Sequence, residues 1–462
     1  MLRIHNSLTG KKEEFKPLRG NEVRMYVCGM TVYDFIHIGH ARMLTVFDLV
    51  QRYLRARGFD VTYVRNITDI DDKIIQRAAA NGEDWSALAN RFAEAMREDC
   101  ATLGLAIPDF EPRATEYIGP IIAMTQRLIE KGYAYVAAAG DVLYSVRKFS
   151  SYGRLSGKKL DDLRAGSRVR IDESKADPLD FVLWKQAKPG EPSWPSPWGA
   201  GRPGWHIECS AMSTALLGDY FDIHGGGMDL KFPHHENELA QSCAACDSPF
   251  VRVWMHNGFV RINDEKMSKS LGNFFTVRDV LKAVRAPEVL KFFLLGSHYM
   301  GPINYSEAQL QQADETLLGL YRALYGTASG YAQPLADATT AFEAAMDDDF
   351  NTPEALAVLQ GVARDLNTAK AQGRSTDIPP LAATLLSMGR TLGIFQHAPD
   401  DYLKRSVNQD TMGAAAIEAL IEQRAVARAA KNYAESDRIR DELAAAGVII
   451  EDGTDGSAWR RH

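Results

Sequence analysis

Residues 24–58 read RMYVCGMTVYDFIHIGHARMLTVFDLVQRYLRARG, and they give the first indication of the fold class. The first seven residues form a short apolar run, which predicts a β-strand. Residues 40–58 then have apolar side chains at helical spacing and end in a glycine. A second apolar strand, DVTYVRNI (60–67), follows. A strand, a helix and a strand in this order predict an α/β fold with a parallel sheet and crossover helices.

The rest of the chain predicts two further strands of the sheet, an insertion between the strands, and two more domains. Residues 220–227 and 253–262 are two later strand candidates of the same sheet. The segment between them and the first strands, about 100–204, contains a helix and hairpin-like pieces and is expected to be an insertion. The chain then turns helical, and it ends in a basic helix that could be broken in the middle and an Asp-Gly hairpin. The expected domains are 1–290, 291–400 and 401–462.

Composition restricts the class of protein. The chain has 462 residues and a net charge of -7 from 53 basic and 60 acidic residues, which argues against bulk, non-specific binding of nucleic acid. No apolar run approaches the roughly 18–20 residues of a membrane span. The first residues lack the apolar core of a secretory signal, so a cytoplasmic protein without a membrane partner is expected. Five cysteines in so long a chain do not suggest a disulfide framework.

Two short motifs suit phosphate groups. HIGH spans His37 to His40 at the start of the first helix, where free N–H groups and the helix dipole attract anions. Gly39 removes a side chain where a nucleotide could stack closely. KMSKS begins at Lys266, and a second lysine, Lys269, follows three residues later; both could clamp a polyphosphate. Taken separately, each motif could equally be an ordinary surface helix or a solvated basic loop.

Together the two motifs resemble those of the class I aminoacyl-tRNA synthetases, which carry them in one Rossmann-like catalytic domain. The resemblance implies that ATP, with Mg²⁺, activates an amino acid as its adenylate. It implies that His37 and His40 contact the phosphates and that Lys266 and Lys269 stabilise the departing pyrophosphate. GGGMD (225–229) matches the element that binds the ribose. Gly39, Gly227, Asp229 and Lys269 are therefore expected to bind ATP.

The stretch FPHHENELAQSCAACD (232–247) contains possible metal ligands. On a helix, His234 and Glu238 are four residues apart and share a face. Cys243 lies nine residues beyond His234, which is about 13 Å along the axis and half a turn round. Neither Cys243 nor Cys246 can therefore join His234, and both are expected to be buried thiols packed on a helix. Cys28 and Cys209 could complete a set that suits zinc, although a buried cysteine at a strand end is commonly structural.

Five longer segments make the resemblance more specific: YVCGMTVYDFIHIGHAR, NITDIDDKI, GWHIECSAMS, FDIHGGGMDLKFPHHENELAQS and DEKMSKSLGNFFT. They are similar to the cysteinyl-tRNA synthetase family over essentially the whole chain. The resemblance implies one Zn²⁺ per chain, which binds the cysteine thiolate and so distinguishes cysteine from serine without an editing domain. The implied ligands are Cys28, Cys209, His234 and Glu238. The implied walls of the cysteine pocket are Thr68, Trp205 and His224.

The same resemblance identifies 291–400 as a stem-contact and helical bundle domain and 401–462 as an anticodon-binding module. The implied partners are ATP, L-cysteine and tRNA(Cys), and the protein is expected to be a monomer. Tyr433 stands where members of the family often have a tryptophan. The residues expected to contact tRNA are Arg428, Asp437, Asp452 and, as a stacking surface, Trp459.

Three rival interpretations remain. A ligase that joins cysteine to an amino-sugar would share the scaffold but lack the C-terminal module. A zinc hydrolase built on His234, His235 and Glu236 has no HExxH arrangement and leaves the phosphate motifs unexplained. A non-catalytic tRNA-binding protein would not need both motifs. The acidic residues of NITDIDD are expected to cap the next helix rather than to bind a metal: Asp69, Asp71 and Asp72.

Overall fold

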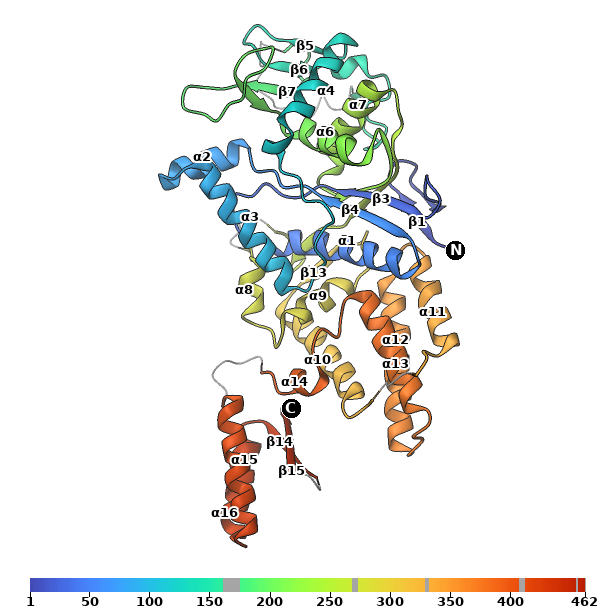
Figure 1. Cartoon of the computed structure of the whole chain (residues 1–462), viewed down its shortest axis with the longest axis vertical. Coiled ribbons are helices and arrows are strands. Elements are labelled where there is room, and N and C mark those ends of the chain that lie inside the picture. Colours follow the sequence, from blue (N-terminus) through green and yellow to red (C-terminus); the bar gives the residue numbers. More distant parts are fainter. Residues whose placement is uncertain (161–174, 268–272, 329–331, 407–411, 454–455, 462) are drawn as a thin grey trace. The chain divides into compact units, whose positions relative to one another are not determined.

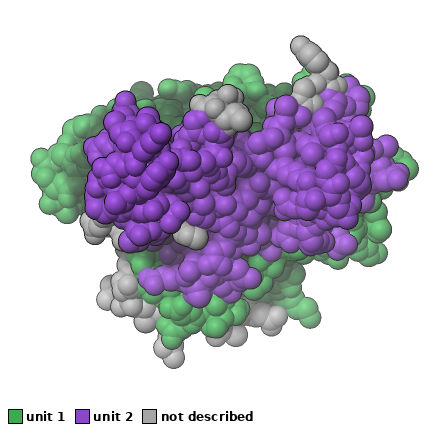
Figure 2. Space-filling view, turned by 90° about the horizontal axis from the view of Figure 1, so that it is seen from below, with its two compact units in different colours: residues 1–277, 297–304, 343–353 green, residues 278–296, 305–342, 354–462 purple. Residues whose placement is uncertain are grey.

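The structure is a computed structural model that describes residues 1–160, 175–267, 273–328, 332–406, 412–453 and 456–461. The chain divides into two compact units, coloured separately in Figure 2. Unit 1 comprises 1–277, 297–304 and 343–353, and unit 2 comprises the remaining residues. Within the described residues, none of the helices has the length and apolar character needed to cross a membrane.

A four-stranded parallel sheet forms the centre of unit 1. Its order is β10 (Phe250–Asn257), β9 (Tyr220–Gly227), β3 (Glu22–Val27) and β4 (Asp60–Arg65). Figure 1 shows α1 on one side of this sheet and α6 on the other. The chain order reverses between β3 and β9, and ligands of such sheets bind at the carboxyl ends of the strands beside that reversal.

Helix α1 (Ile38–Ala56) lies between β3 and β4 as the sequence predicts. Its apolar face is buried, and Phe47 and Leu54 are fully enclosed. Gly225 of β9 allows this packing, because a Cβ there would lie 2.2 Å from the Phe47 ring. A small residue in the strand therefore lets helix and sheet approach closely.

The segment after β4 ends in α2 (Asp72–Asn81), followed by α3 (Trp85–Thr102). Asp71 caps α2, since its carboxylate accepts from the backbone N–H of Lys73, as expected. Asp72 instead forms ion pairs with Lys185 and Arg202. Asp69 accepts from the N–H and hydroxyl of Thr115 and does not cap the helix.

The inserted segment has its own antiparallel sheet. α4 (Ile118–Glu130) is followed by the sheet β5–β6–β7–β8, and then the chain enters α6 (Trp205–Leu217). Apolar side chains of α4, of this sheet and of α6 and α7 (Glu236–Cys246) share one core. The insertion therefore packs against the two helices that hold the predicted metal ligands. The strand bounds are Ala134–Val136, Val142–Tyr144, Phe181–Gln186 and Gly201–Pro203.

Residues 253–262, expected as one strand, form parts of two. β10 ends at Asn257, and β11 (Val260–Ile262) begins after Gly258 and pairs with β12 (Glu265–Lys266) and β13 (Ile303–Tyr305). A Cβ on Gly258 would lie 2.3 Å from the carbonyl oxygen of Gly301, so the break occurs where another backbone approaches closely. A short hairpin, β1 (Arg3–Asn6) and β2 (Lys11–Glu14), begins the chain.

The chain after residue 277 is mainly helical, as predicted. The basic C-terminal helix is broken into α15 and α16, and β14 (Val448–Gly453) pairs antiparallel with β15 (Gly456–Arg461). The helices are α8 (Val277–Leu281), α9 (Pro287–Leu295), α10 (Glu307–Leu324), α11 (Ala336–Asp347), α12 (Thr352–Ala371), α13 (Ile378–Leu392), α14 (Pro399–Leu403), α15 (Ala414–Ala429) and α16 (Tyr433–Ala445).

Candidate active site and metal centre

The HIGH residues form the start of α1. His37 is the N-cap, and its Nδ1 accepts from the backbone N–H groups of Gly39 and His40 at 3.1 and 3.2 Å. The rings of His37 and His40 stack with centroids 3.6 Å apart. The two imidazoles therefore lie together at the positive end of the helix dipole, where an anion is favoured.

The described start of the second motif lies beside the first. Lys266 ends β12, and Lys269 lies outside the described residues. The Met267 side chain lies next to Gly39: a Cβ on that glycine would be 3.4 Å from the methionine methyl carbon. Beyond the loop, the N–H of Val277 donates to the Ile36 carbonyl at 2.9 Å. Backbone pairing thus holds the described residues around both motifs side by side.

The predicted ribose element follows β9 at the same edge of the sheet. Gly227 is the last residue of β9, and Asp229 is exposed two residues later. A Cβ on Gly227 would lie 2.3 Å from Asp229 Oδ1. The glycine therefore leaves room for the carboxylate, which can accept hydrogen bonds from hydroxyl groups.

Four predicted metal ligands meet in a buried cluster. Cys28 directly follows β3, and Cys209 lies on α6. His234 lies in the helical turn before α7, and Glu238 lies in the first turn of α7. Pro233 belongs to that preceding turn, Lys231–His235, and not to α7. His234 Nε2 still lies 3.0 Å from Glu238 Oε1, as the four-residue spacing predicts.

The separations between Cys28 Sγ and the other three donor atoms are those of a tetrahedral site. Cys28 Sγ lies 3.5 Å from Cys209 Sγ, 3.5 Å from His234 Nε2 and 3.3 Å from Glu238 Oε1. A tetrahedral ion with bonds of about 2.0–2.3 Å separates its ligand atoms by about 3.3–3.8 Å. The four donors could therefore hold a metal ion with small adjustments of their side chains.

A second group of four donors shares two of these residues. Cys28 and Glu238 also lie near His224 and His235. His224 Nε2, however, is already 2.8 Å from Glu238 Oε2, and His235 Nε2 lies 3.9 Å from Glu238 Oε1. The first group has two sulfur donors and closer separations, so it is the better site for a soft, tetrahedral ion.

The charges of the cluster are strongly coupled. Burial opposes ionisation of Glu238, but His224 and His234 hold the pKa of its carboxyl well below the ordinary value. Burial likewise opposes charge on His234, yet Glu238 and Cys209 raise the pKa of this imidazole to about 10. Burial raises the pKa of Cys28, whereas hydrogen bonds from Cys28 and His234 outweigh burial and lower the pKa of Cys209 to about 6. The cluster favours a thiolate and a carboxylate, which are the forms that bind cations.

Two of the three predicted pocket residues contact this cluster. The Trp205 ring lies 4.2 Å from the His234 ring, between centroids, and Trp205 is 38% exposed, so it is not a core aromatic. His224 is buried against Glu238 and stacks on Trp254 at 4.5 Å. The Thr68 hydroxyl donates to Glu208 Oε2 at 3.2 Å. Trp205 and His224 therefore contact residues of the metal cluster, and Thr68 contacts Glu208, the sequence neighbour of Cys209.

Sequence reasoning missed two polar residues of this region. His206 Nδ1 lies 2.9 Å from His234 Nδ1, and Glu208 is a buried acidic residue that accepts a hydrogen bond from the Thr68 hydroxyl. Burial and then His234 lower the pKa of His206 well below the ordinary value, so this imidazole is neutral. Their place in GWHIECSAMS, within three residues of Cys209, was the available signal.

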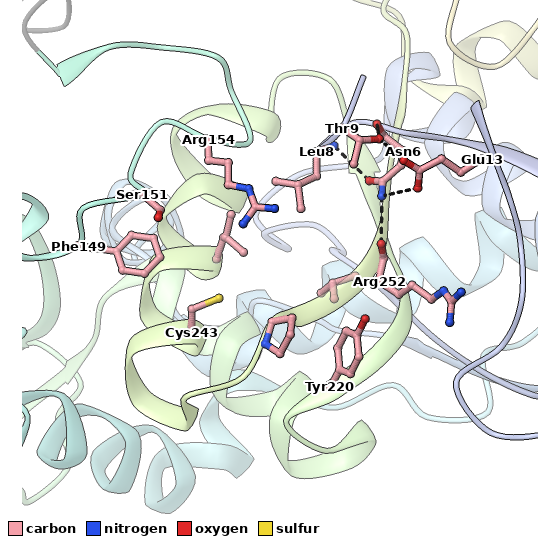
Figure 3. Close-up of a pocket in the computed structure, with 13 residues that line it drawn as sticks. Asn6, Leu8, Thr9, Glu13, Phe149, Ser151, Arg154, Tyr220, Cys243 and Arg252 are labelled. Carbon is pink, nitrogen blue, oxygen red and sulfur yellow. Dashed lines mark hydrogen bonds between the residues drawn. The ribbon is translucent and has the colours of Figure 1, made fainter. Parts of the chain in front are cut away.

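The Cys-Ala-Ala-Cys pair lies apart from the metal cluster. Cys243 lines a separate cavity of about 300 Å³, and Figure 3 shows its thiol and the Arg154 guanidinium directed into that space. Burial raises the pKa of Cys243 to about 12 and that of Cys246 to about 11, so both are protonated thiols. They are half-buried rather than fully buried. Neither belongs to a metal-binding group of the described residues.

Among the C-terminal residues expected to contact tRNA, the polar ones lie at the surface of the module and the tryptophan lies in its core. Asp452 accepts from Arg424 at 2.7 and 2.9 Å and from Arg428 at 2.8 Å, while Asp437 is exposed. Trp459 is only 5% exposed and packs in the core of the module, so the expected stacking surface is corrected to a core side chain. Tyr433 is 64% exposed and is the available aromatic ring.

Comparisons with known proteins agree with this geometry. Three family models match the chain: the tRNA synthetases class I (C) catalytic domain over 14–315, the DALR domain over 341–396, and the cysteinyl-tRNA ligase anticodon binding domain over 413–460. A methionyl-tRNA synthetase structure from Mycobacterium tuberculosis is 15% identical, covers 81% of this chain and 90% of its own, and has a TM-score of 0.56. A putative arginyl-tRNA synthetase from Campylobacter jejuni is 12% identical, with a TM-score of 0.55 and coverage of 81% and 93%. The fold and the phosphate motifs are those of a class I aminoacyl-tRNA synthetase.

Curated relatives give the finer identification. The cysteine–tRNA ligase of Methylococcus capsulatus is 60% identical over 100% of both chains. That of Pseudomonas syringae pv. tomato is 57% identical over 100% of this chain and 99% of its own. The chain belongs to the cysteine–tRNA ligase family.

Proposed function

We propose that this enzyme activates L-cysteine with ATP and transfers it to the 3′ end of tRNA(Cys), using Zn²⁺ to select the cysteine thiolate. The observation that supports zinc is the buried set of two thiols, one imidazole and one carboxylate at tetrahedral separations. Zinc bound there supplies a Lewis acid that favours a thiolate over a hydroxyl group. Cysteine and serine differ by one atom, which a hydrophobic pocket distinguishes by only about 1–3 kcal/mol.

In the proposed first step, a carboxylate oxygen of cysteine attacks the α-phosphorus of ATP, and the bond to the β-phosphate oxygen breaks. His37 and His40 bind the phosphates at the N-terminus of α1, and Lys266 and Lys269 stabilise the pyrophosphate that leaves. Asp229 accepts hydrogen bonds from the ribose hydroxyls beside Gly227. Position and charge stabilise the transition state, since no covalent enzyme intermediate is needed.

In the second step, a hydroxyl of the terminal tRNA ribose attacks the acyl carbon, and AMP leaves. The side chain of the substrate cysteine is held at the metal cluster. The walls of its pocket are formed by Thr68, Trp205 and His224. Mg²⁺ accompanies ATP. We expect Arg428, Asp437, Asp452 and Tyr433 to contact the anticodon, and a monomer to be the active form.

The test is charging of total tRNA with labelled cysteine and, in parallel, with serine, before and after removal of zinc by a chelator. Cysteine-only charging that is lost with zinc and restored by zinc supports the proposal. Cys209→Ser is expected to lose bound zinc and cysteine activation, and the matched control Cys243→Ser is expected to keep both. Cysteine-dependent ATP–pyrophosphate exchange without tRNA charging would instead indicate an amino-sugar acceptor. Unchanged charging in the zinc-free enzyme would contradict the role of zinc.

A further inference from the structure

We infer that His206 is a positioning residue that fixes the tautomer and the ring orientation of His234, and this inference rests on the proposed zinc site. The two Nδ1 atoms lie 2.9 Å apart, so one of them must donate to the other. His206 comes from the first turn of α6 and His234 from the turn before α7. The contact therefore joins α6, which carries Cys209, to the turn that leads into α7, which carries Glu238.

Which of the two nitrogens donates is determined by the other ring nitrogen of His234, Nε2. Nε2 faces the cluster, 3.5 Å from Cys28 Sγ and 3.0 Å from Glu238 Oε1. A nitrogen that binds a metal must keep its lone pair, so the proton of a neutral His234 has to be on Nδ1. That proton then points at His206 Nδ1, which accepts it. His206 in turn must have its own proton on Nε2.

The surroundings hold His206 in this orientation. The Phe181 ring meets the His206 ring edge to face at 5.5 Å, and the Trp205 ring lies 5.1 Å away. His206 and Cys209 are three residues apart on one helix, so a ligand and the partner of another ligand are positioned by the same turn. Partners of this kind commonly change metal affinity by about 10–100-fold when they are removed.

Two substitutions separate the hydrogen bond from the volume of the ring. In His206→Asn the amide oxygen can occupy the place of Nδ1 and still accept from His234. In His206→Gln the amide reaches the place of Nε2 instead and leaves His234 without an acceptor. The readout is zinc affinity, measured by competition with a chromophoric chelator, together with the unfolding temperature of each zinc-free protein.

We expect His206→Gln to bind zinc about 10–100-fold more weakly than the unmodified enzyme. His206→Asn is expected to stay within about threefold, because it keeps an acceptor for the His234 proton. Equal affinity in all three proteins, or equal loss in both variants, would overturn the inference. If the unmodified enzyme binds no zinc, the proposed function fails instead, so the two failures are distinguishable.

A measurement on the unmodified enzyme avoids any folding defect in the variants. Nitrogen-15 labelling of histidine and NMR of the zinc-loaded protein report which ring nitrogen is protonated in each histidine. The inference requires one zinc-bound histidine with its proton on Nδ1, in a hydrogen bond to an unprotonated histidine nitrogen. A zinc-bound histidine protonated on Nε2 would contradict it.

Discussion

Arg42, two residues beyond His40, is a charged side chain that solvent does not reach. Its Nη2 donates to the carbonyls of His298 and Gly301 at 2.9 and 3.2 Å. Burial lowers its pKa to about 10, so the guanidinium remains charged at neutral pH. The Gly301 carbonyl also lies against Gly258, just before the strands that lead to Lys266. Arg42 therefore links α1, which begins with the HIGH motif, to the backbone segment that packs beside the strands leading to Lys266.

Replacing Arg42 should affect both stability and catalysis. Arg42→Met leaves buried carbonyl groups without their donor, so we expect a loss of roughly 2–4 kcal/mol in the free energy of unfolding. Urea unfolding of the zinc-loaded enzyme measures this loss. ATP–pyrophosphate exchange should fall as well, because the two motifs are no longer held in register. Arg42→Lys keeps a charge but not the planar fork, and it is expected to recover only part of either property. Full exchange activity in Arg42→Met would rule out this linking role.

Among single residues, the four proposed metal ligands could be predicted, whereas His206, which contacts one of them, could not. Helical spacing indicated His234 and Glu238, whereas the family resemblance implied Cys28 and Cys209. The structure brings all four together. His206 looks ordinary in the sequence, because its partner comes from a turn that lies 28 positions further along the chain. The burial of Trp459 was also hidden, since a tryptophan near the end of a chain suits a core as well as a surface.

At the scale of elements, the packing of α1 on β9 depends on Gly225. Gly225→Ala places a methyl group 2.2 Å from the Phe47 ring, and that ring is fully enclosed. We expect a loss of about 1–3 kcal/mol, which is typical of overpacking in a core. Gly119→Ala on α4 is the matched control, because a Cβ there meets nothing within 4 Å. The control should be neutral or stabilise by up to about 1 kcal/mol. Equal urea midpoints for the two variants would contradict this account of the packing.

The hairpin β14–β15 depends on Asp452, and this gives a pH-dependent prediction. Hydrogen bonds from Arg424 and Ser457 hold the pKa of Asp452 below its ordinary range. A carboxyl whose pKa is lowered on folding stabilises the fold above the unfolded pKa of about 3.9 and loses that contribution as pH falls below it. The protection of the hairpin amides against hydrogen exchange, corrected for the intrinsic exchange rate at each pH, should therefore decrease as the pH of the full chain falls from about 5 toward 2.

Asp452→Asn supplies the comparison for that experiment. At pH 7 the variant should exchange faster in β14 and β15 than the unmodified chain, because the paired bonds from Arg424 are weakened. The difference between the two proteins should shrink as the pH falls below about 4, because the Asp452 carboxyl of the unfolded chain is then protonated and the variant has no carboxyl at this position. The side chain of Asp452 is 41% exposed, so solvent screening limits the effect to about 1 kcal/mol or less. An unchanged difference across this range would assign the effect to a cause other than charge.

The elements that the sequence predicted best are those set by local pattern. The strand–helix–strand beginning, the strand 220–227 and the terminal hairpin all follow from apolar spacing and turn residues. The break after Asn257 did not, because it depends on the approach of the Gly301 carbonyl from a distant segment. Likewise, Asp72 looked like a cap, but it pairs with Lys185 and Arg202, whose positions the local sequence does not reveal.

At the scale of the whole molecule, the chain combines sections with separate tasks. The catalytic family model ends at 315, and the anticodon-binding model covers 413–460. The compact units are not continuous in sequence, since 297–304 and 343–353 belong to unit 1. Sequence patterns report only neighbouring residues, so the expected limits at 290 and 400 stay predictions. The division of labour between the sections can be tested directly.

Removing residues 407–462 should separate amino-acid activation from tRNA charging. All four proposed zinc ligands and both phosphate motifs lie before residue 278, so the shortened enzyme is expected to keep its zinc and its ATP–pyrophosphate exchange. Its kcat/KM for tRNA(Cys) should fall roughly 100-fold or more, because each lost base contact contributes about 1–3 kcal/mol. The control is the full chain with Tyr433→Ala, which should lose a smaller part of the same kcat/KM and none of the exchange.

The dependence on salt then distinguishes base contacts from general attraction to phosphates. A module that binds mainly through phosphate contacts makes charging fall steeply as salt rises, and its removal should flatten that slope. The net charge of -7 argues that this electrostatic part is small, so the slope should change little while kcat/KM falls strongly. A shortened enzyme that charges tRNA normally would show that 407–462 has another role. Loss of exchange together with charging would show that catalysis itself needs this segment.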